Sequence, residues 1–272
     1  MQSQNLFDLT GRVAIVTGGA GLLGVQHAKA VHLGGGIPVL ADLNLQRAQA
    51  AASQVGERAI GMYLDVTSEE TISACLTEIL SRFGQINIHI NNAARNPMVE
   101  GTSTSTSFSR FEEQDVDTWA LDMAVGLTGP MLCSKIIGTH MAASGGGVIL
   151  NIGSEYALVA PDQRVYEQPG LPPDRQPKKP ASYSVVKHGI IGLTKYLATY
   201  WADKGVRVNC LCPGAISNDQ PGEFVRRFSN LIPMGRMARP DEMQGAVIFL
   251  CSDASRFMTG AVVTVDGGRT VW

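Results

Sequence analysis

Val13-Ala-Ile-Val-Thr-Gly-Gly-Ala-Gly-Leu-Leu-Gly24 is the stretch that decides the fold of this 272-residue chain. Its first four residues form an apolar run that is typical of a buried strand. Three of its glycines follow in a Gly-x-Gly-x-x-Gly spacing, and an amphipathic stretch continues to about Leu33. In a strand, loop and helix of this kind, the glycines allow a tight turn and let the backbone approach a pyrophosphate closely. The N-terminus of the helix then stabilises the charge of the pyrophosphate. The stretch therefore predicts a dinucleotide-binding unit.

An acidic residue completes this pattern. Asp42 stands at the end of a second expected strand, Ile37 to Ala41, eighteen positions after Gly24. A carboxylate there accepts hydrogen bonds from both adenosine ribose hydroxyls and repels a 2′-phosphate. The loop between Thr17 and Gly24 also contains no Arg or Lys. We therefore expect the cofactor to be NAD and not NADP.

Strand-like and helix-like segments alternate along the rest of the chain. Further strands are expected at 59–64, 86–90, 147–152, 206–211 and 262–265, and helices at 45–55, 68–83, 115–141, 182–201 and 241–250. Such alternation predicts an α/β fold with a doubly wound parallel sheet, the Rossmann fold. Since no linker or shift in composition divides the chain, residues 1–272 are expected to form a single domain.

Two segments interrupt this alternation. Residues Asn96 to Ser109 are rich in Ser and Thr and are interpreted as a polar loop. Pro161 to Pro180 contains six prolines, which exclude a regular helix or a central strand. Long loops in compact domains commonly act as lids or binding loops. We therefore expect an insertion at about residues 159–180.

Composition narrows the possible partners and location. The formal net charge of −2 argues against a nucleic-acid partner, because no basic face is available. Residues 1–5 lack the features of a signal peptide, and the apolar runs are too short to span a membrane. Five scattered cysteines suggest reduced thiols and a cytoplasmic protein. No metal site is expected, and Cys210 and Cys212 are expected to point to opposite faces of one strand.

Tyr183 and Lys187 carry the expected chemistry. They stand four residues apart in the helix expected at 182–201 and should share one face of it. A free phenol has a pKa of about 10, and a neighbouring cation lowers that pKa by favouring the phenolate. Tyr183 is therefore expected to act as an acid and base near neutral pH. Together with the dinucleotide loop, this pair predicts hydride transfer.

Motifs in the same order resemble those of the short-chain dehydrogenase/reductase family, from about Leu9 to Gly268. The glycine spacing is that of the two-domain branch, whereas the rest looks like the single-domain branch. The matching segments are Thr17 to Gly24, Leu64-Asp65-Val66, Asn91-Asn-Ala-Ala94, Asn151-Ile-Gly-Ser154, Tyr183 with Lys187, Pro213-Gly214 and Val265-Asp-Gly-Gly268. Ala94 stands where the family usually has glycine.

The resemblance implies a role for each matching residue. Tyr183 would exchange a proton with the substrate oxygen, Lys187 would hold the nicotinamide ribose, and Ser154 would hydrogen-bond the substrate oxygen. The implied cofactor contacts are Gly18, Gly19, Gly21, Leu22, Leu23, Gly24, Asp42, Asp65, Val66, Asn92, Ala93, Tyr183, Lys187, Pro213, Gly214 and Ile216.

The chain departs from the family pattern in two places. Family members of the single-domain branch usually supply a helix asparagine to a proton relay, and Gly126 occupies that position. The spacing from Ser154 to Tyr183 is also longer than usual, because the proline-rich insertion enters there. Its polar residues and Tyr166 suit a hydroxyl-rich or charged substrate better than a steroid or acyl chain.

Short segments resemble a narrower group within the family. Ile152 to Ala157, Tyr166-Glu167 and Ser217 to Pro221 look similar to enzymes of flagellin and surface-glycan modification. Those enzymes act on amino-sugar nucleotides toward legionaminic-acid-type sugars. Features are also shared with gluconate and polyol dehydrogenases of the family. The resemblance implies substrate contacts from Glu155, Tyr156, Tyr166 and Glu167.

The expected function is NAD-dependent hydride transfer at a secondary alcohol or ketone of a sugar, sugar nucleotide or polyol. The alternatives are a 3-oxoacyl carrier-protein reductase and a catalytically weak NAD-binding partner subunit. A homotetramer or homodimer is also expected. The helix holding Tyr183 is apolar over more of its circumference than one core face requires. The side chains concerned are Ile190, Ile191, Leu193, Tyr196, Leu197, Tyr200 and Trp201.

Overall fold

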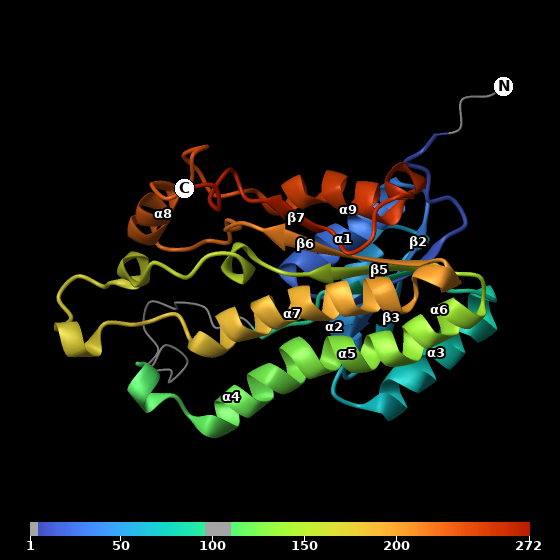
Figure 1. Ribbon diagram of the computed structural model, residues 1–272, viewed down its shortest axis with the longest axis horizontal. Helices are drawn as coiled ribbons and strands as arrows, with labels where there is room; N and C mark the ends of the chain where they lie inside the picture. The colour runs from blue at the N-terminus through green and yellow to red at the C-terminus, as the bar shows by residue number, and fades with distance from the viewer. Residues whose placement is uncertain (1–4, 96–109) are drawn as a thin grey trace.

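Seven parallel strands form the centre of the computed structural model, which describes residues 5–95 and 110–272 (Figure 1). Their order across the sheet is β3-β2-β1-β4-β5-β6-β7. The strands are β1 (Val13–Thr17), β2 (Ile37–Asp42), β3 (Ile60–Tyr63), β4 (Ile88–Asn91), β5 (Gly147–Ile152), β6 (Val206–Pro213) and β7 (Val262–Val265). The predicted doubly wound α/β fold is confirmed, and each predicted strand lies within two residues of an observed one.

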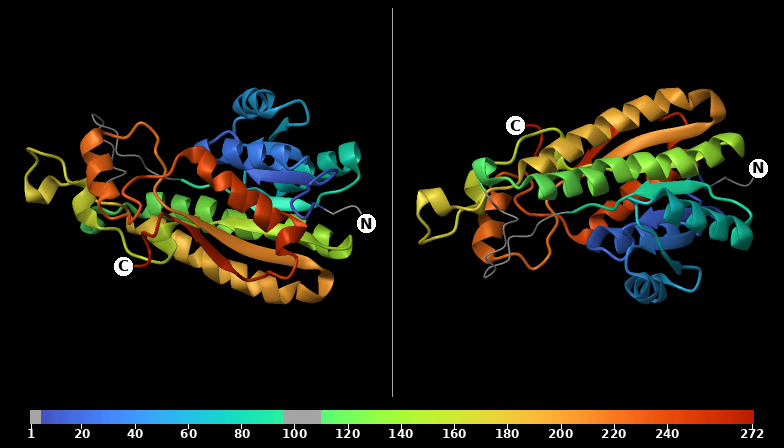
Figure 2. Two further views of the ribbon diagram at one scale, coloured as in Figure 1. Left: turned by 90° about the horizontal axis from the view of Figure 1, so that it is seen from above. Right: turned by 90° about the horizontal axis from the view of Figure 1, so that it is seen from below.

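Helices cover both faces of the sheet (Figure 2). Their bounds are α1 (Leu22–Leu33), α2 (Leu45–Val55), α3 (Glu69–Phe83), α4 (Val116–Met123), α5 (Gly129–Cys133), α6 (Thr139–Ala143), α7 (Ala181–Tyr200), α8 (Gly222–Ser229) and α9 (Gln244–Cys251). Two π-helical stretches, Ala124–Thr128 and Ser134–Gly138, join α4, α5 and α6 into one long helix. Helix α8 is the element that the sequence pattern did not predict.

The two faces of the sheet have separate cores. Val13 and Ile15 of β1 pack on one side with residues of α3, of the α4–α6 helix and of α7. Ala14 and Val16 pack on the other side with residues of α1, α2 and α9. Because side chains alternate along a strand, a central strand must be apolar throughout. This requirement explains the continuous apolar run before the glycine loop.

The long α4–α6 helix is apolar because it packs on this sheet. By length and composition alone, Val116–Ala143 could span a membrane. In the fold it lies beside α7 and contributes Cys133, Ile137 and Met141 to the core (Figure 1). Its apolar residues are therefore accounted for in part by burial against the sheet.

The proline-rich insertion behaves as its prolines predicted. Between Pro161 and Pro180 the chain forms two short 3-10 turns, Gln163–Tyr166 and Pro173–Arg175, and no helix or strand. It projects beyond the carboxyl end of the sheet (Figure 1). The other expected loop, Asn96 to Ser109, lies outside the described residues. The insertion thus extends the edge at which the functional loops gather.

One expectation about the strands is wrong. The Sγ atoms of Cys210 and Cys212 lie 3.7 Å apart on the same face of β6. Residues two apart in a strand share a face, since the side-chain period of a strand is two. All five cysteines are buried and free.

Candidate active site

A cavity of about 670 Å³ opens where the carboxyl ends of β1, β2, β4, β5 and β6 meet the N-terminal part of α7. Strand order reverses between β1 and β4, and ligands of open α/β sheets bind at such a switch point. The predicted residues that line this cavity are Gly18, Gly21, Leu22, Leu23, Asp42, Asn92, Ala93, Ser154, Glu155, Tyr156, Tyr166, Tyr183, Lys187, Pro213, Gly214 and Ile216. Residues expected to act together therefore come together.

Five predicted residues do not line the cavity: Gly19, Gly24, Asp65, Val66 and Glu167. Asp65 instead accepts hydrogen bonds from the backbone and hydroxyl of Thr67. The Glu167 side chain is exposed, and its carbonyl accepts from Arg227. Glu167 and Tyr166 are consecutive at the end of a short turn, so their side chains diverge and only Tyr166 turns inward.

The glycines shape one end of the cavity. Gly18 has φ +61°, a left-handed conformation that favours glycine. A Cβ on Gly24 would lie 2.2 Å from the Gly18 carbonyl oxygen, so only glycine lets α1 start this close to the loop. The N-cap residue of α1, Gly21, supplies no side-chain cap, which leaves first-turn N–H groups for a ligand. This end fits a pyrophosphate.

Asp42 lies at the rim beyond the glycines. Its carboxylate accepts from the backbone N–H of Ala20 at 3.1 Å and from that of Asn44 at 3.1 Å. Arg47 lines the same rim and donates to the Ala20 carbonyl at 3.4 Å. The sequence prediction considered basic residues only in the glycine loop and missed this arginine. Its signal was its position in the first turn of the helix after Asp42.

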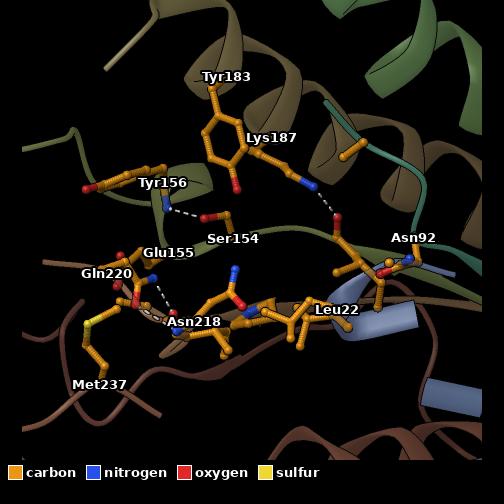
Figure 3. Close-up of a pocket in the computed structure, with 18 of the residues that line it drawn as sticks. Leu22, Asn92, Ser154, Glu155, Tyr156, Tyr183, Lys187, Asn218, Gln220 and Met237 are labelled. Carbon is orange, nitrogen blue, oxygen red and sulfur yellow. Dashed lines mark hydrogen bonds between the residues drawn. The ribbon is translucent and has the colours of Figure 1, made fainter. Parts of the chain in front are cut away.

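Ser154, Tyr183 and Lys187 gather at the other end (Figure 3). Ser154 follows the end of β5, and its hydroxyl accepts from the backbone N–H of Tyr156 at 3.2 Å. Tyr183 points toward Ser154 from the first turn of α7. Lys187 lies one turn later and donates to the carbonyl of Ile152 at 2.8 Å. The loop after β5 and helix α7 therefore position the three side chains.

Burial controls the charge of the tyrosine. It raises the pKa of Tyr183, and the hydrogen bond from Ser154 opposes that rise. Burial also lowers the pKa of Lys187 to about 8. The net shift of the Tyr183 pKa is therefore opposite to the expected lowering by Lys187. The Lys187 ammonium lies 5.8 Å from the Tyr183 ring centroid, and burial is the largest cause of the raised Tyr183 pKa.

Packing against α7 explains why residue 126 is a glycine. A Cβ at this position would lie 2.6 Å from Cγ1 of Val186, which stands between Tyr183 and Lys187 on α7. The two helices approach too closely for a side chain there. Three buried polar residues form a hydrogen-bonded chain: Asn91 donates to Asn151 at 2.8 Å, and Asn151 donates to Thr194 at 2.9 Å.

Glu155 is a buried carboxyl in the substrate end of the cavity. Its Oε2 atom has no hydrogen-bond partner among residues 5–95 and 110–272. Burial raises the pKa of Glu155 to about 7, although the Arg269 guanidinium opposes this rise. The Tyr156 and Tyr166 hydroxyls lie 3.0 Å apart nearby. This end can therefore bind a ligand that carries hydroxyl or other hydrogen-bonding groups.

Lys179 is a cavity residue that the sequence prediction did not single out. It is the penultimate residue of the insertion, it is buried, and its ammonium lies 4.1 Å from the Tyr183 ring centroid. Only its sequence position beside the Tyr183 helix could have indicated it.

Comparisons with known proteins agree with this geometry. The family described as short chain dehydrogenase matches residues 12–166, and that described as Enoyl-(Acyl carrier protein) reductase matches residues 174–270. A D-threitol dehydrogenase of Mycolicibacterium smegmatis is 33% identical over 97% of this chain and 95% of its own length. A galactitol 2-dehydrogenase (L-tagatose-forming) of Cereibacter sphaeroides is 30% identical over the full length of both chains.

Two further proteins differ in the cofactor they name. An NAD-dependent glycerol dehydrogenase of Listeria innocua is 29% identical over 97% of this chain and 96% of its own. A gluconate 5-dehydrogenase structure from Burkholderia cenocepacia J2315, in complex with NADP and tartrate, has a TM-score of 0.85 at 28% identity and covers 98% of both chains. The similar proteins thus include both nicotinamide cofactors.

Proposed function

This chain belongs to the short-chain dehydrogenase/reductase family of oxidoreductases, and from that premise we propose that it is an NAD-dependent dehydrogenase of a polyol or sugar. One observation carries the proposal. Ser154, Tyr183 and Lys187 meet at one end of a cavity whose other end holds the glycine loop and Asp42. A single extended dinucleotide can therefore reach from the Asp42 rim to the three side chains.

The cofactor end supports NAD through Asp42. Its carboxylate lines the rim and keeps acceptor capacity for ribose hydroxyls beyond its two backbone hydrogen bonds. The first-turn N–H groups of α1 would hold the pyrophosphate, and Lys187 would hold the nicotinamide ribose. When bound, the nicotinamide supplies the acceptor or donor of a hydride.

Three residues of the chain would handle the substrate oxygen. Ser154 would donate a hydrogen bond to it, and Tyr183 would take its proton when the alcohol is oxidised. Since burial raises the Tyr183 pKa, formation of the phenolate needs nearby positive charge. Lys187 is one such charge, and a bound oxidised nicotinamide adds another.

The substrate end supports a hydroxyl-rich substrate. Glu155, Tyr156 and Tyr166 supply carboxyl and hydroxyl groups, while Phe224 and Met237 supply apolar walls. Few polar groups set in an apolar wall are typical of small-molecule sites. The named substrates of the relatives, threitol, galactitol and glycerol, have the same chemical character.

The proposal is tested with the purified protein, either NAD or NADP, and a panel of threitol, galactitol, glycerol and gluconate. We expect NADH formation with at least one polyol, and loss of turnover in Tyr183→Phe with NAD affinity nearly unchanged. Lys187→Met should lower both turnover and NAD affinity, because Lys187 would also hold the nicotinamide ribose. A phenylalanine variant that keeps more than about a tenth of the rate, a barrier change of roughly 1.4 kcal/mol, would rule out Tyr183 as the acid/base.

A further inference from the structure

The proline-rich insertion ends on a fixed cation. The backbone N–H of Lys179 donates to Oε1 of Gln163 at 2.8 Å, and its carbonyl accepts from Nε2 of the same glutamine at 3.4 Å. Gln163 thus clamps the backbone of Lys179 from both sides. Lys179 as a whole is 8% exposed, and its ammonium lies 4.1 Å from the Tyr183 ring centroid. That distance is within the range of a cation–π contact.

We propose that Lys179 is a positioning residue that acts through Tyr183, because its ammonium over the ring stabilises the phenolate form. This inference rests on the proposed function of Tyr183 as the acid/base and adds a second cation to it. A phenolate spreads negative charge into its ring, so a cation over the ring attracts it more strongly than the neutral phenol.

The surroundings of Tyr183 create a need for this cation. Burial opposes the phenolate, and two neighbouring groups raise the Tyr183 pKa further: Glu155 after β5 and Cys212 of β6. The Tyr156 and Tyr183 rings also lie edge to face, with their centroids 6.2 Å apart. Ser154 and Lys187 remain as the stabilising groups within the family pattern. Gly126 offers no side chain here, because Val186 fills that space.

The charge state of Lys179 agrees with this role. Burial and the repulsion from Lys187 lower the pKa of Lys179 to about 8, and Asp122 of α4 opposes that change. Lys179 is therefore an ammonium at neutral pH. Asp122 is itself held by the Ser182 hydroxyl at 2.5 Å and by Arg95 at 3.0 Å. The insertion, α4 and the start of α7 together form the charged surroundings of the tyrosine.

The step that Lys179 supports is a proton transfer. During oxidation the O–H bond of the substrate alcohol breaks, and its proton forms an O–H bond on the Tyr183 phenolate. When bound, an oxidised nicotinamide would accept the hydride from the carbon that carries this oxygen, and the alcohol would become a ketone. A cation over the ring lowers the pH at which Tyr183 is ready to accept the proton.

Titration of Tyr183 in protein saturated with NAD tests the inference without substrate, because the positive nicotinamide is expected to bring the phenolate into the pH range where Lys179 is still an ammonium. The near-ultraviolet phenolate absorbance of the wild-type protein, minus that of Tyr183→Phe, reports this tyrosine alone. We expect Lys179→Met to move its titration upward by about one pH unit, which is tenfold in phenolate at a given pH. Lys179→Arg should keep the wild-type titration. Lys178→Met is the matched control, because it removes the same charge one residue away and outside the cavity lining.

Kinetics provide a second readout on the polyol that the enzyme turns over. In the pH profile of kcat/KM for oxidation, the rise on the acid side should occur about one pH unit higher in Lys179→Met than in the wild-type protein. At still higher pH the variant should reach the wild-type rate. Should Lys179→Met fail to fold, Lys179→Gln takes its place. An unmoved Tyr183 titration, an equal movement in Lys178→Met, or a uniform loss of rate at every pH would overturn the inference. Absence of turnover in the wild-type protein would contradict the proposed function alone, since the titration needs no substrate.

Discussion

Glu155 and Tyr183 face the same cavity, and the protein interior resists a charge on each of them. Burial raises the pKa of both side chains. The Arg269 guanidinium opposes this rise for the Glu155 carboxyl, and the Lys179 ammonium lies over the Tyr183 ring. A buried charge costs folding free energy unless neighbouring groups compensate it. At the scale of single residues, a charge on either Glu155 or Tyr183 therefore lowers the free energy of unfolding, unless a neighbouring group compensates the charge.

The Glu155 carboxyl makes the stability of the protein depend on pH. Its pKa is about 7 when folded, against an ordinary value of 4.5. Between these values the native state keeps a proton that the unfolded chain has released, so stability falls as pH rises through this window. Above pH 7 the cost is constant at about 3 kcal/mol.

Glu155→Gln should remove this cost. Urea unfolding at pH 8 should show the variant to be more stable than the wild-type protein by up to about 3 kcal/mol. At pH 4.5 the two should differ little, because the native carboxyl is then neutral. Glu57→Gln, on an exposed turn, is the control. A difference between variant and wild type that is the same at both pH values would contradict a raised pKa.

We expect Asp42 and Arg47 to have opposite effects on the choice between NAD and NADP. Both line the rim of the cavity beside Ala20, and a 2′-phosphate there would meet the carboxylate and the guanidinium. We expect NAD to bind more tightly than NADP in the wild-type protein. Asp42→Ala should narrow that ratio, and Arg47→Ala should weaken NADP more than NAD. Calorimetric Kd values for both cofactors decide this, and equal wild-type affinities would refute the NAD assignment.

At the scale of elements, α7 is fixed by how closely the α4–α6 helix approaches it. Gly126 lies in the π-helical stretch Ala124–Thr128, where Val186 of α7 fills the space that a side chain would need. Gly189 on α7 meets Leu127 in the same way, since its Cβ would lie 2.9 Å from Leu127 Cδ1. Small residues at the crossing thus hold Tyr183 and Lys187 in register with the sheet edge.

Gly126→Ala should therefore destabilise the protein. A forced contact of 2.6 Å costs typically about 1–3 kcal/mol, which exceeds the roughly 0.5–1 kcal/mol that alanine gains over glycine in a helix. In a Val186→Ala background the same substitution should be neutral or stabilising. Gly192→Ala on α7, with no neighbour within 4 Å, should stabilise in either background. Urea unfolding of the double-mutant cycle measures the coupling, and its absence would contradict the packing account.

The insertion acts as one element because its glutamines organise it. Gln163 holds Lys179, and Gln176 accepts from the backbone of Gln168 at 2.8 Å while donating to the Leu171 carbonyl at 2.7 Å. Tyr166 and Lys179 are the two insertion residues that line the cavity. We propose that the segment is a substrate lid, as its position between Ser154 and α7 suggests.

Replacement of residues 161–180 by a short Gly-Ser linker should raise KM and lower kcat for the true substrate. NAD affinity should change little, because the glycine loop and Asp42 lie at the other end of the cavity. Leu171→Ser, at the exposed tip, should leave both constants unchanged. Steady-state kinetics and cofactor titrations separate these effects. An unaltered kcat/KM in the linker variant would show that the insertion is only a surface feature.

At the scale of the whole molecule, apolar residues remain exposed on one face. The helices α4–α6 and α7 lie side by side in both figures that show the fold. Their exposed apolar residues are Val116, Leu121, Met131, Val185, Tyr196 and Tyr200. Of the α7 residues first taken as an interface, Ile190, Leu197 and Trp201 are instead buried within the chain. Tyr196 and Tyr200 stay exposed and stack on each other, with centroids 5.7 Å apart.

We propose that this face joins copies of the chain into a homodimer or homotetramer. Light scattering at micromolar concentration should give a mass at least twice 29.0 kDa. Tyr196→Glu combined with Tyr200→Glu should reduce that mass, because two buried charges would oppose association. Leu33→Ser is the control, since it removes an exposed apolar residue from α1 on the other face of the sheet. This substitution should leave the mass unchanged. A monomeric wild-type mass would refute the proposal.

The local patterns of the sequence were sufficient to predict the strands, the helices other than α8, and the proposed catalytic pair. The apolar run before the glycines, Asp42 after the next strand, and the spacing of Tyr183 and Lys187 each depend on neighbours within a few residues. Side-chain periods of two and 3.6 then assign strand and helix, and alternation assigns a parallel sheet. The fold was therefore largely predictable from local patterns, whereas most of the residues that line the cavity were predicted from the family resemblance.

What the tertiary structure alone decided concerns contacts between segments far apart in the chain. Val186 explains Gly126, Arg47 reaches the Asp42 rim, and Lys179 meets Tyr183 only after the insertion has folded back. Desolvation is also a property of the whole fold, so the Tyr183 pKa moved opposite to the direction expected from one neighbouring lysine. Burial and long-range packing depend on every segment at once, and a local pattern does not contain them.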